Sequence, residues 1–203
     1  MKKLFLCSYL KGVESKFLNF VNDNHLNREV TFVNTASEVE DYTKYVDEAM
    51  EVFTKLNFNI KKLDITNEST EHIKKVLNET KNLYVSGGNT FYLLQQFQIK
   101  NLNQFIVERI SNGMVYIGES AGSIITSSNI EYNQIMDEKI KAPNLKNNYG
   151  LNLISFYPLV HYKENPFQKS SQKTFEVYSH FIDLIKIDNK QAIIVKDELY
   201  TII

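Results

Sequence analysis

The sequence contains little cysteine, glycine and proline, and no tryptophan. Among its 203 residues there are one cysteine (Cys7), seven glycines and three prolines. A single cysteine excludes an intrachain disulfide and supplies no set of thiolates for a metal ion. It also fits a reducing compartment, where disulfides are rare.

Positive charge is not in excess. The 23 Lys and Arg residues are balanced by 24 Asp and Glu residues, which gives a formal net charge of −1 at pH 7. Nucleic-acid binding usually requires a concentrated excess of Lys and Arg. We therefore expect no nucleic-acid partner, and we interpret clusters such as Lys61-Lys62 as solvated faces.

Long apolar runs are missing as well. The N-terminal run Met1–Cys7 resembles the start of a signal peptide, but it is interrupted at Ser8 and Lys11 and lacks a small-residue cleavage site. We interpret it as a first buried strand. No stretch approaches the length needed to span a bilayer, so we expect no membrane partner and a cytoplasmic location.

Composition and periodicity predict the fold class. Hydrophobic residues at 43% and charged residues at 23% are ordinary globular values, and the length fits a single domain, residues 1–203. The expected strands are 1–7, 29–34, 58–65, 82–85 and 114–117, and the expected helices are 13–21, 41–56, 69–79, 91–99 and 102–110. This alternation predicts a three-layer α/β fold: a largely parallel, doubly wound sheet with helices on both faces and ligands at the carboxyl ends of the strands.

The clearest helical periodicity begins at Asp41, which we expect to be an N-cap. The apolar stripe that follows includes Tyr42 and Tyr45, and we interpret it as core rather than as a ligand site.

The chain becomes less regular beyond Ile125. Residues 126–148 are mostly polar, which is typical of an irregular segment that frames a site. We expect a strand at 151–154, a helix at 173–185 and a final hairpin within 191–203.

Two glycine-containing turns follow neighbouring strands of this pattern. Gly118–Gly122 has the form G-x-S-x-G, which can turn a strand sharply into a helix and expose Ser120 beside backbone N–H groups that face incoming negative charge. In such a nucleophile elbow, a Cβ at either glycine would collide with backbone. The alternative is a tight turn whose serine only caps the helix. The second turn, Ser86–Thr90, should lie on the same edge of the sheet.

A serine nucleophile needs a base, and histidine is the usual one. His25 lies in a polar turn, His72 on a charged helix face and His180 inside a predicted helix. His161 ends an apolar, strand-like run at the edge where Ser120 is expected, so His161 is the candidate base.

Together, Ser86–Phe91, Gly118–Ser123 and the later histidine resemble the peptidase E (aspartyl dipeptidase) family of serine peptidases, family S51, in its short bacterial branch. The resemblance covers essentially the whole chain. It implies a flavodoxin-like fold similar to class I glutamine amidotransferases, with a serine in place of their cysteine.

The resemblance also implies roles for individual residues. Ser120 matches the nucleophile and His161 the base, while the Gly88 and Ala121 N–H groups match the oxyanion donors. Ala121 also fits on physical grounds, because its N–H directly follows the nucleophile. Asn89 lies where it would orient substrate.

The third member of the triad is less clearly marked. In the family, an acidic residue just before the final hairpin orients the histidine. The matching place contains Asp188 and Asn189, of which Asn189 is the better aligned, and Asp137 is a further alternative. We expect Asp188. Asn189 would instead give an arrangement close to Cys-His-Asn, which orients the imidazole without a full counter-charge.

Recognition of an N-terminal aspartate would require a cation, ideally Arg. Neither Arg28 nor Arg109 lies in the region after His161, where only lysines are available. The sequence therefore does not support a preference for aspartyl peptides.

These features predict a dipeptidase-like serine peptidase that acts on small peptides, without a metal or organic cofactor, as a monomer or homodimer. A non-catalytic member of the same fold that binds a small peptide or metabolite remains an alternative. An esterase of the α/β-hydrolase kind is disfavoured because His161 precedes Asp188, although Asp137 would restore the acid-then-histidine order of that fold.

Overall fold

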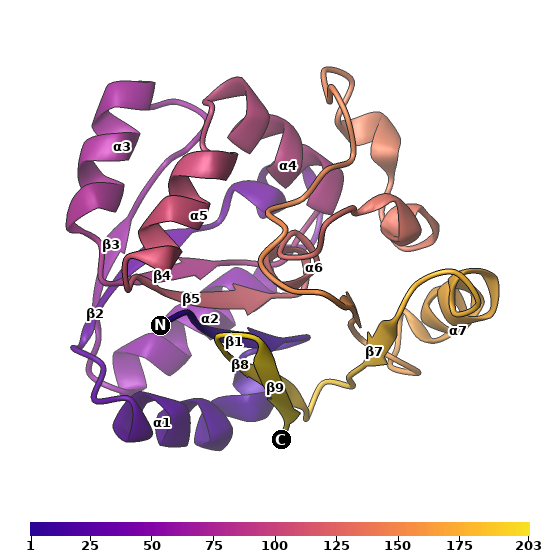
Figure 1. Cartoon of the computed structure of the whole chain (residues 1–203), viewed down its shortest axis with the longest axis horizontal. Coiled ribbons are helices and arrows are strands. Elements are labelled where there is room, and N and C mark those ends of the chain that lie inside the picture. Colours follow the sequence, from indigo (N-terminus) through magenta and orange to yellow (C-terminus); the bar gives the residue numbers. More distant parts are fainter.

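The β-branched and aromatic runs of the sequence form a central seven-stranded sheet, described here for all 203 residues from a computed structural model (Figure 1). Its strand order is β3-β2-β4-β5-β1-β8-β9. The strands are β1 (Lys3–Cys7), β2 (Glu29–Val33), β3 (Asn59–Lys62), β4 (Asn82–Val85), β5 (Val115–Glu119), β8 (Ala192–Lys196) and β9 (Leu199–Ile202). β1 to β5 run parallel, and β8 and β9 form an antiparallel hairpin beside β1. The predicted parallel sheet and final hairpin are confirmed.

Helices cover both faces of the sheet (Figure 1). One face carries α1 (Glu14–Asp23) and α2 (Lys44–Lys55), and the other carries α3 (Thr70–Glu79), α4 (Thr90–Ile99) and α5 (Asn103–Ser111). Each face has its own buried cluster. In the α1/α2 layer Phe17 is fully buried edge-to-face against Phe5 and Phe53, with centroids 5.2 and 5.4 Å away. Burying one such ring contributes about 1.5–3 kcal/mol, so the aromatic residues stabilise the layered α/β fold.

The predicted start of α2 is wrong. The helix begins at Lys44, and its N-cap residue Thr43 makes no capping side-chain hydrogen bond, so Asp41 is not the N-cap. Tyr42 is 65% exposed and Tyr45 is half-buried. A bend at Asp41 therefore leaves Tyr42 outside the core, whereas Tyr45 lies within α2 and packs against the buried cluster.

The segment after Ile125 differs most from expectation. Residues 151–154 are not a strand, because their backbone pairs with residues 125–127 instead of with the sheet. The helix predicted at 173–185 is α7 (Gln168–Tyr178), and Leu184–Lys186 is instead a strand, β7, paired with β6 (Tyr157–Leu159). Short apolar runs are compatible with either a helix or a strand, and here tertiary pairing decides between them. No helix of the chain is long and apolar enough to cross a membrane.

Candidate active site

Ser120 occupies a sharp turn between β5 and the short helix α6 (Ala121–Ile124). Its backbone has φ 48° and ψ −108°, which is costly for a non-glycine residue and is found where surrounding structure holds it. The Ser120 N–H donates to the Cys7 carbonyl at 2.9 Å, and the Ser123 hydroxyl donates to the same carbonyl at 2.8 Å. The end of β1 thus holds the strained turn in place.

The glycines that flank Ser120 have the predicted steric role. A Cβ on Gly122 would lie 2.1 Å from the Val85 carbonyl oxygen, and a Cβ on Gly118 would lie 2.5 Å from the Gly122 oxygen. Both distances are far below contact distance, so the turn packs against β4 only with glycine at these positions.

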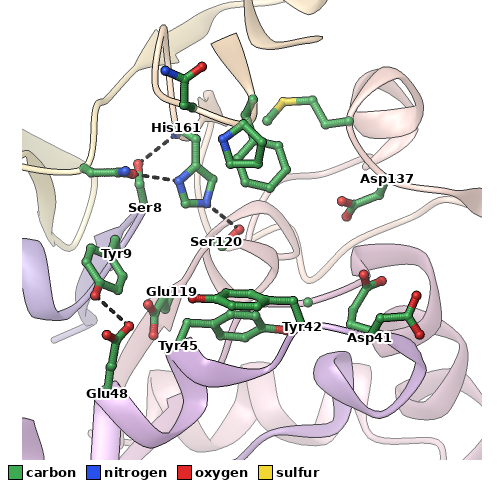
Figure 2. Close-up of a pocket in the computed structure, with 18 of the residues that line it drawn as sticks. Ser8, Tyr9, Asp41, Tyr42, Tyr45, Glu48, Glu119, Ser120, Asp137 and His161 are labelled. Carbon is green, nitrogen blue, oxygen red and sulfur yellow. Dashed lines mark hydrogen bonds between the residues drawn. The ribbon is translucent and has the colours of Figure 1, made fainter. Parts of the chain in front are cut away.

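His161 follows β6 and points its ring at the serine. Its Nε2 lies 3.0 Å from Ser120 Oγ (Figure 2). The residue has φ 53°, its N–H donates to Ser8 Oγ at 3.0 Å, and its ring stacks on Phe167 with centroids 4.7 Å apart. Burial lowers the pKa of His161 to about 4, against a smaller opposing effect from its hydrogen bond to Asn189. The imidazole is therefore neutral at pH 7.

Asn189, not Asp188, is the residue that contacts the histidine. His161 Nδ1 lies 2.7 Å from Asn189 Oδ1. Because an amide oxygen only accepts hydrogen bonds, Nδ1 carries the proton and Nε2 is free to accept from the Ser120 hydroxyl. The Asp188 carboxylate instead accepts the Lys190 N–H at 2.7 Å. The expectation that Asp188 orients His161 is wrong, and Asp137 makes no hydrogen bond to His161 either.

The loop after β1 contains two positioning residues that the sequence did not reveal. Ser8 Oγ accepts the His161 N–H and donates to the Ile187 carbonyl at 3.2 Å. Gly12 lies so close to Asn189 that a Cβ there would be 2.0 Å from the Asn189 carbonyl oxygen. Both residues follow β1, which lies beside β5 in the sheet. Because the sequence does not show the order of the strands, it does not indicate that these residues are near the site.

The two glycine-containing turns meet as predicted. A Cβ on Gly87 would lie 3.2 Å from Ser120 Cβ. Gly88, with φ 128°, and Ala121 both have backbone N–H groups without a hydrogen-bond acceptor in the protein. These are the two N–H groups expected to receive an oxyanion.

Asn89 does not face the cavity that adjoins Ser120. It is 1% exposed. Its Oδ1 caps α4 by accepting the Tyr92 N–H at 2.9 Å, and its Nδ2 donates to the Glu138 carbonyl at 3.1 Å. Asn89 therefore has a structural role, and its side chain is not part of the cavity lining where substrate contact was expected.

A cavity of about 860 Å³ opens beside Ser120, His161 and Asn189 (Figure 2). Tyrosines and carboxylates dominate the rest of its lining. The tyrosines are Tyr9, Tyr42 and Tyr45, and the carboxylates are Glu40, Asp41, Glu48, Glu119, Asp137 and Glu138. Lys141 is the only Lys or Arg in this lining. We call Ser120, His161 and Asn189 the neutral side of the cavity, and Glu40, Asp41, Asp137 and Glu138 its acidic side.

Glu119 lies beneath the serine turn and is 2% exposed. Its carboxylate accepts hydrogen bonds from the Tyr84 hydroxyl and, at 3.1 Å, from the Leu10 N–H. Burial raises the pKa of Glu119 to about 7, although these two hydrogen bonds oppose the shift. Glu119 thus links β5 to β4 and to the loop after β1 directly under the nucleophile position.

The fold places the chain among proteins of the peptidase E type. A crystal structure of a peptidase E-type protein from Listeria monocytogenes superposes with a TM-score of 0.93 and 40% identity, covering 100% of this chain and 98% of that one. A peptidase from an acI-B1 actinobacterium shares the fold with a TM-score of 0.71 at 18% identity, covering 100% of this chain and 87% of that one.

The family follows from the sequence itself. Residues 4–203 match the profile of peptidase family S51, and the chain belongs to this family of peptidases. An uncharacterized peptidase of Listeria innocua is 42% identical over 198 residues, 98% of this chain and 94% of that protein. A peptidase E of Salmonella arizonae is 30% identical over 138 residues, 67% of this chain and 56% of that protein.

Proposed function

We propose that the protein is a serine peptidase that hydrolyses short peptides, in the manner of a dipeptidase. The observation that carries this proposal is the alignment of Ser120 Oγ, the His161 ring and Asn189 Oδ1, with contacts of 3.0 and 2.7 Å. A nucleophile, a base within hydrogen-bond reach and a third group that orients the base are the parts that acyl transfer requires.

In this mechanism Ser120 Oγ attacks the scissile carbonyl while His161 Nε2 takes its proton. The negative charge that develops on the carbonyl oxygen is received by the N–H groups of Gly88 and Ala121. His161 then gives the proton to the departing amine, and water, activated by the same imidazole, releases the acyl group from Ser120. Asn189 holds the Nδ1–H tautomer throughout.

The neutral imidazole suits this role. Because burial keeps the pKa of His161 near 4, Nε2 is unprotonated and available as a base from weakly acidic pH upward. The cavity volume of about 860 Å³ falls within the range of small-ligand sites, about 300–1,000 Å³, and fits a short peptide better than an extended chain.

The test is hydrolysis of a dipeptide library by the wild-type protein and by Ser120→Ala, followed by mass spectrometry. We expect turnover to fall by about 10³-fold or more in the variant, because no other nucleophile lies at that place. A small fluorophosphonate should label Ser120 in the wild type and leave the variant unmodified. Peptide hydrolysis that survives Ser120→Ala would contradict the proposal, and a wild-type protein that neither hydrolyses peptides nor is labelled would leave only a binding role.

A further inference from the structure

We propose that Asp137 binds a protonated amine of the substrate and so selects peptides with a positive charge next to the scissile bond. The inference deepens the proposed function, since it assumes that the cavity beside Ser120 takes peptides. It assigns the acidic side of that cavity to substrate recognition.

The Asp137 carboxylate is held with one oxygen engaged and the other free. Its Oδ2 accepts three hydrogen bonds, from the Thr90 N–H at 2.8 Å, the Thr90 hydroxyl at 2.6 Å and the Asn133 amide at 2.8 Å. Its Oδ1 accepts none from the protein. Figure 2 shows the carboxylate facing the same cavity as Ser120 and His161. A fixed carboxylate with a free oxygen is suited to accept from an ammonium group.

Ion pairs inside the protein account for most of the other carboxylates in the cavity. Lys141 pairs with Glu40 at 3.1 Å and with Glu138 at 3.4 Å. Glu48 pairs with Lys11 at 3.5 Å. Among the carboxylates that line the cavity, Asp137 and Glu119 are fixed by protein donors and have no cation within salt-bridge distance, and of these two only Asp137 keeps a free oxygen.

Glu119 and Asp41 fit this role less well. Both oxygens of Glu119 are already used, by the Tyr84 hydroxyl and the Leu10 N–H. Asp41 is exposed and has no hydrogen bond that would fix its carboxylate. A substrate amine that enters the cavity therefore meets Asp137 as the rigid, uncompensated negative group.

A second polar group in the cavity lacks a partner. The Tyr45 hydroxyl is buried without any hydrogen bond, although Tyr45 lines the cavity. Its ring lies near that of Tyr42, with centroids 6.2 Å apart. A phenol oxygen can accept from an ammonium group, and tyrosine faces attract cations, so this independent feature is suited to the same charge.

The position of Asp137 relates the amine to the reacting carbonyl. Asp137 binds Thr90, the first residue of α4, only two residues beyond the oxyanion donor Gly88. Gly87 in turn adjoins Ser120. We therefore place the substrate amine on the residue whose carbonyl is attacked.

An acidic substrate side chain is disfavoured by the same features. The positive end of α4 is already occupied by Asp137 and capped by Asn89. Both arginines bind backbone carbonyls elsewhere, Arg28 that of Leu56 and Arg109 that of Asn78. A substrate carboxylate would meet uncompensated negative charge and no arginine.

The experiment measures binding separately from catalysis, by calorimetry with the Ser120→Ala protein. The probes are Ala-Ala, N-acetyl-Ala-Ala and N-acetyl-Lys-Ala. We expect at least one of the two ammonium-bearing peptides, Ala-Ala or N-acetyl-Lys-Ala, to bind about 10- to 100-fold more tightly than N-acetyl-Ala-Ala, which has the same C-terminal carboxylate but no ammonium group, as for a charge-assisted hydrogen bond. The two ammonium-bearing probes distinguish an α-ammonium group from a side-chain ammonium group as the source.

Adding Asp137→Asn to Ser120→Ala should abolish this preference, because the amide retains an oxygen for Thr90 but carries no charge. Glu131→Gln is the matched control: it removes one negative charge from an exposed residue earlier in the same segment of the chain that does not line the cavity, and we expect no change. Tyr45→Phe is a second variant and should weaken binding of the preferred peptide several-fold. Circular dichroism verifies that each variant is folded.

Equal binding of the three peptides, binding of none, or a preference that survives Asp137→Asn would overturn the proposal. Amine-dependent binding by a protein whose wild type neither hydrolyses peptides nor reacts with the fluorophosphonate would refute the serine-peptidase function and leave the amine site standing. The two proposals therefore fail in distinguishable ways.

Discussion

The two sides of the cavity differ in charge, although they are built from the same edge of the sheet. The side with Ser120 uses a neutral imidazole and a neutral amide, joined by contacts of 3.0 and 2.7 Å. The opposite side carries carboxylates, including Asp137, whose Oδ2 accepts three hydrogen bonds. Apart from Glu119, which is buried beneath the serine turn and has a pKa of about 7, the protein places neutral groups beside the nucleophile and several carboxylates along the rest of the cavity.

Burial shifts the pKa values of His161 and Asp137 in opposite directions, since it disfavours the charged form of any group. It lowers the pKa of His161 to about 4, so the imidazole stays a base. It raises the pKa of Asp137 to about 6, so this carboxylate is ionised at pH 7 but at a cost in stability. The difference teaches that His161 is neutral at pH 7 at no such cost, whereas an ionised Asp137 costs stability that a bound cation would recover.

The largest test of the neutral side removes the amide that orients His161. Asn189→Ala should lower kcat for peptide hydrolysis by about 10²-fold, because the ring loses the acceptor that fixes its tautomer and direction. Asp188→Ala is the matched control and should keep kcat within a few-fold, since the Asp188 carboxylate contacts only the Lys190 N–H. Steady-state kinetics of both variants decide the matter: a greater loss for Asp188→Ala would reverse the assignment of the third residue.

A smaller effect is expected when charge is added to the neutral side. In Asn189→Asp the carboxylate would favour the imidazolium form and raise the pKa of His161 from about 4. The pH below which a fluorophosphonate labels Ser120 more slowly should then rise by about one unit. At the most affected pH, the labelling rate should be about tenfold lower than in the wild type. Labelling rates measured from pH 4 to 8 test this without a titrating substrate. An unchanged profile would show that residue 189 does not influence the imidazole.

The smallest expected effect is a gain in stability when the charge of Asp137, on the acidic side, is removed. The pKa of Asp137 is about 6 in the folded protein, above the usual value for an unfolded chain of about 3.9. The folded state therefore binds more protons between pH 4 and 6, and the contribution of Asp137 to stability is lost as the pH rises through 6. The free energy of unfolding of Asp137→Asn should therefore be about 1–2 kcal/mol higher than that of the wild type at pH 7.5.

This stability difference should shrink as the pH falls from 7.5 toward 4, because the carboxyl is then protonated in the folded state and increasingly protonated in the unfolded state. Urea denaturation at pH 7.5 and 4.5 measures it, with Glu131→Gln as the control that should show no such change. His161 contributes to the pH dependence of stability with the opposite sign. Because both proteins contain His161, this contribution cancels when the variant is compared with the wild type at each pH. A variant that is less stable than the wild type at pH 7.5 would mean that the ionised carboxylate stabilises the fold.

Much of the fold could be predicted from the sequence because its signals are local. Alternating apolar runs and turn residues predicted β1 to β5 and α1 to α5, and the G-x-S-x-G turn predicted that a Cβ at Gly118 or Gly122 would collide with backbone. The region after Ile125 could not be predicted as well, since short apolar segments such as 151–154 take their structure from backbone partners distant in the sequence.

The amino-acid sequence by itself determined the serine turn, the parallel sheet and the proximity of Ser120 and His161, because glycine sterics and strand direction follow from residue types and their order. Only the tertiary structure decided that Asn189 and not Asp188 meets the imidazole, and that Asp137 and Tyr45 face the cavity. Adjacent residues project in different directions, and the direction each takes here is set by contacts from Ser8 and Gly12 in a loop more than 170 residues earlier in the chain.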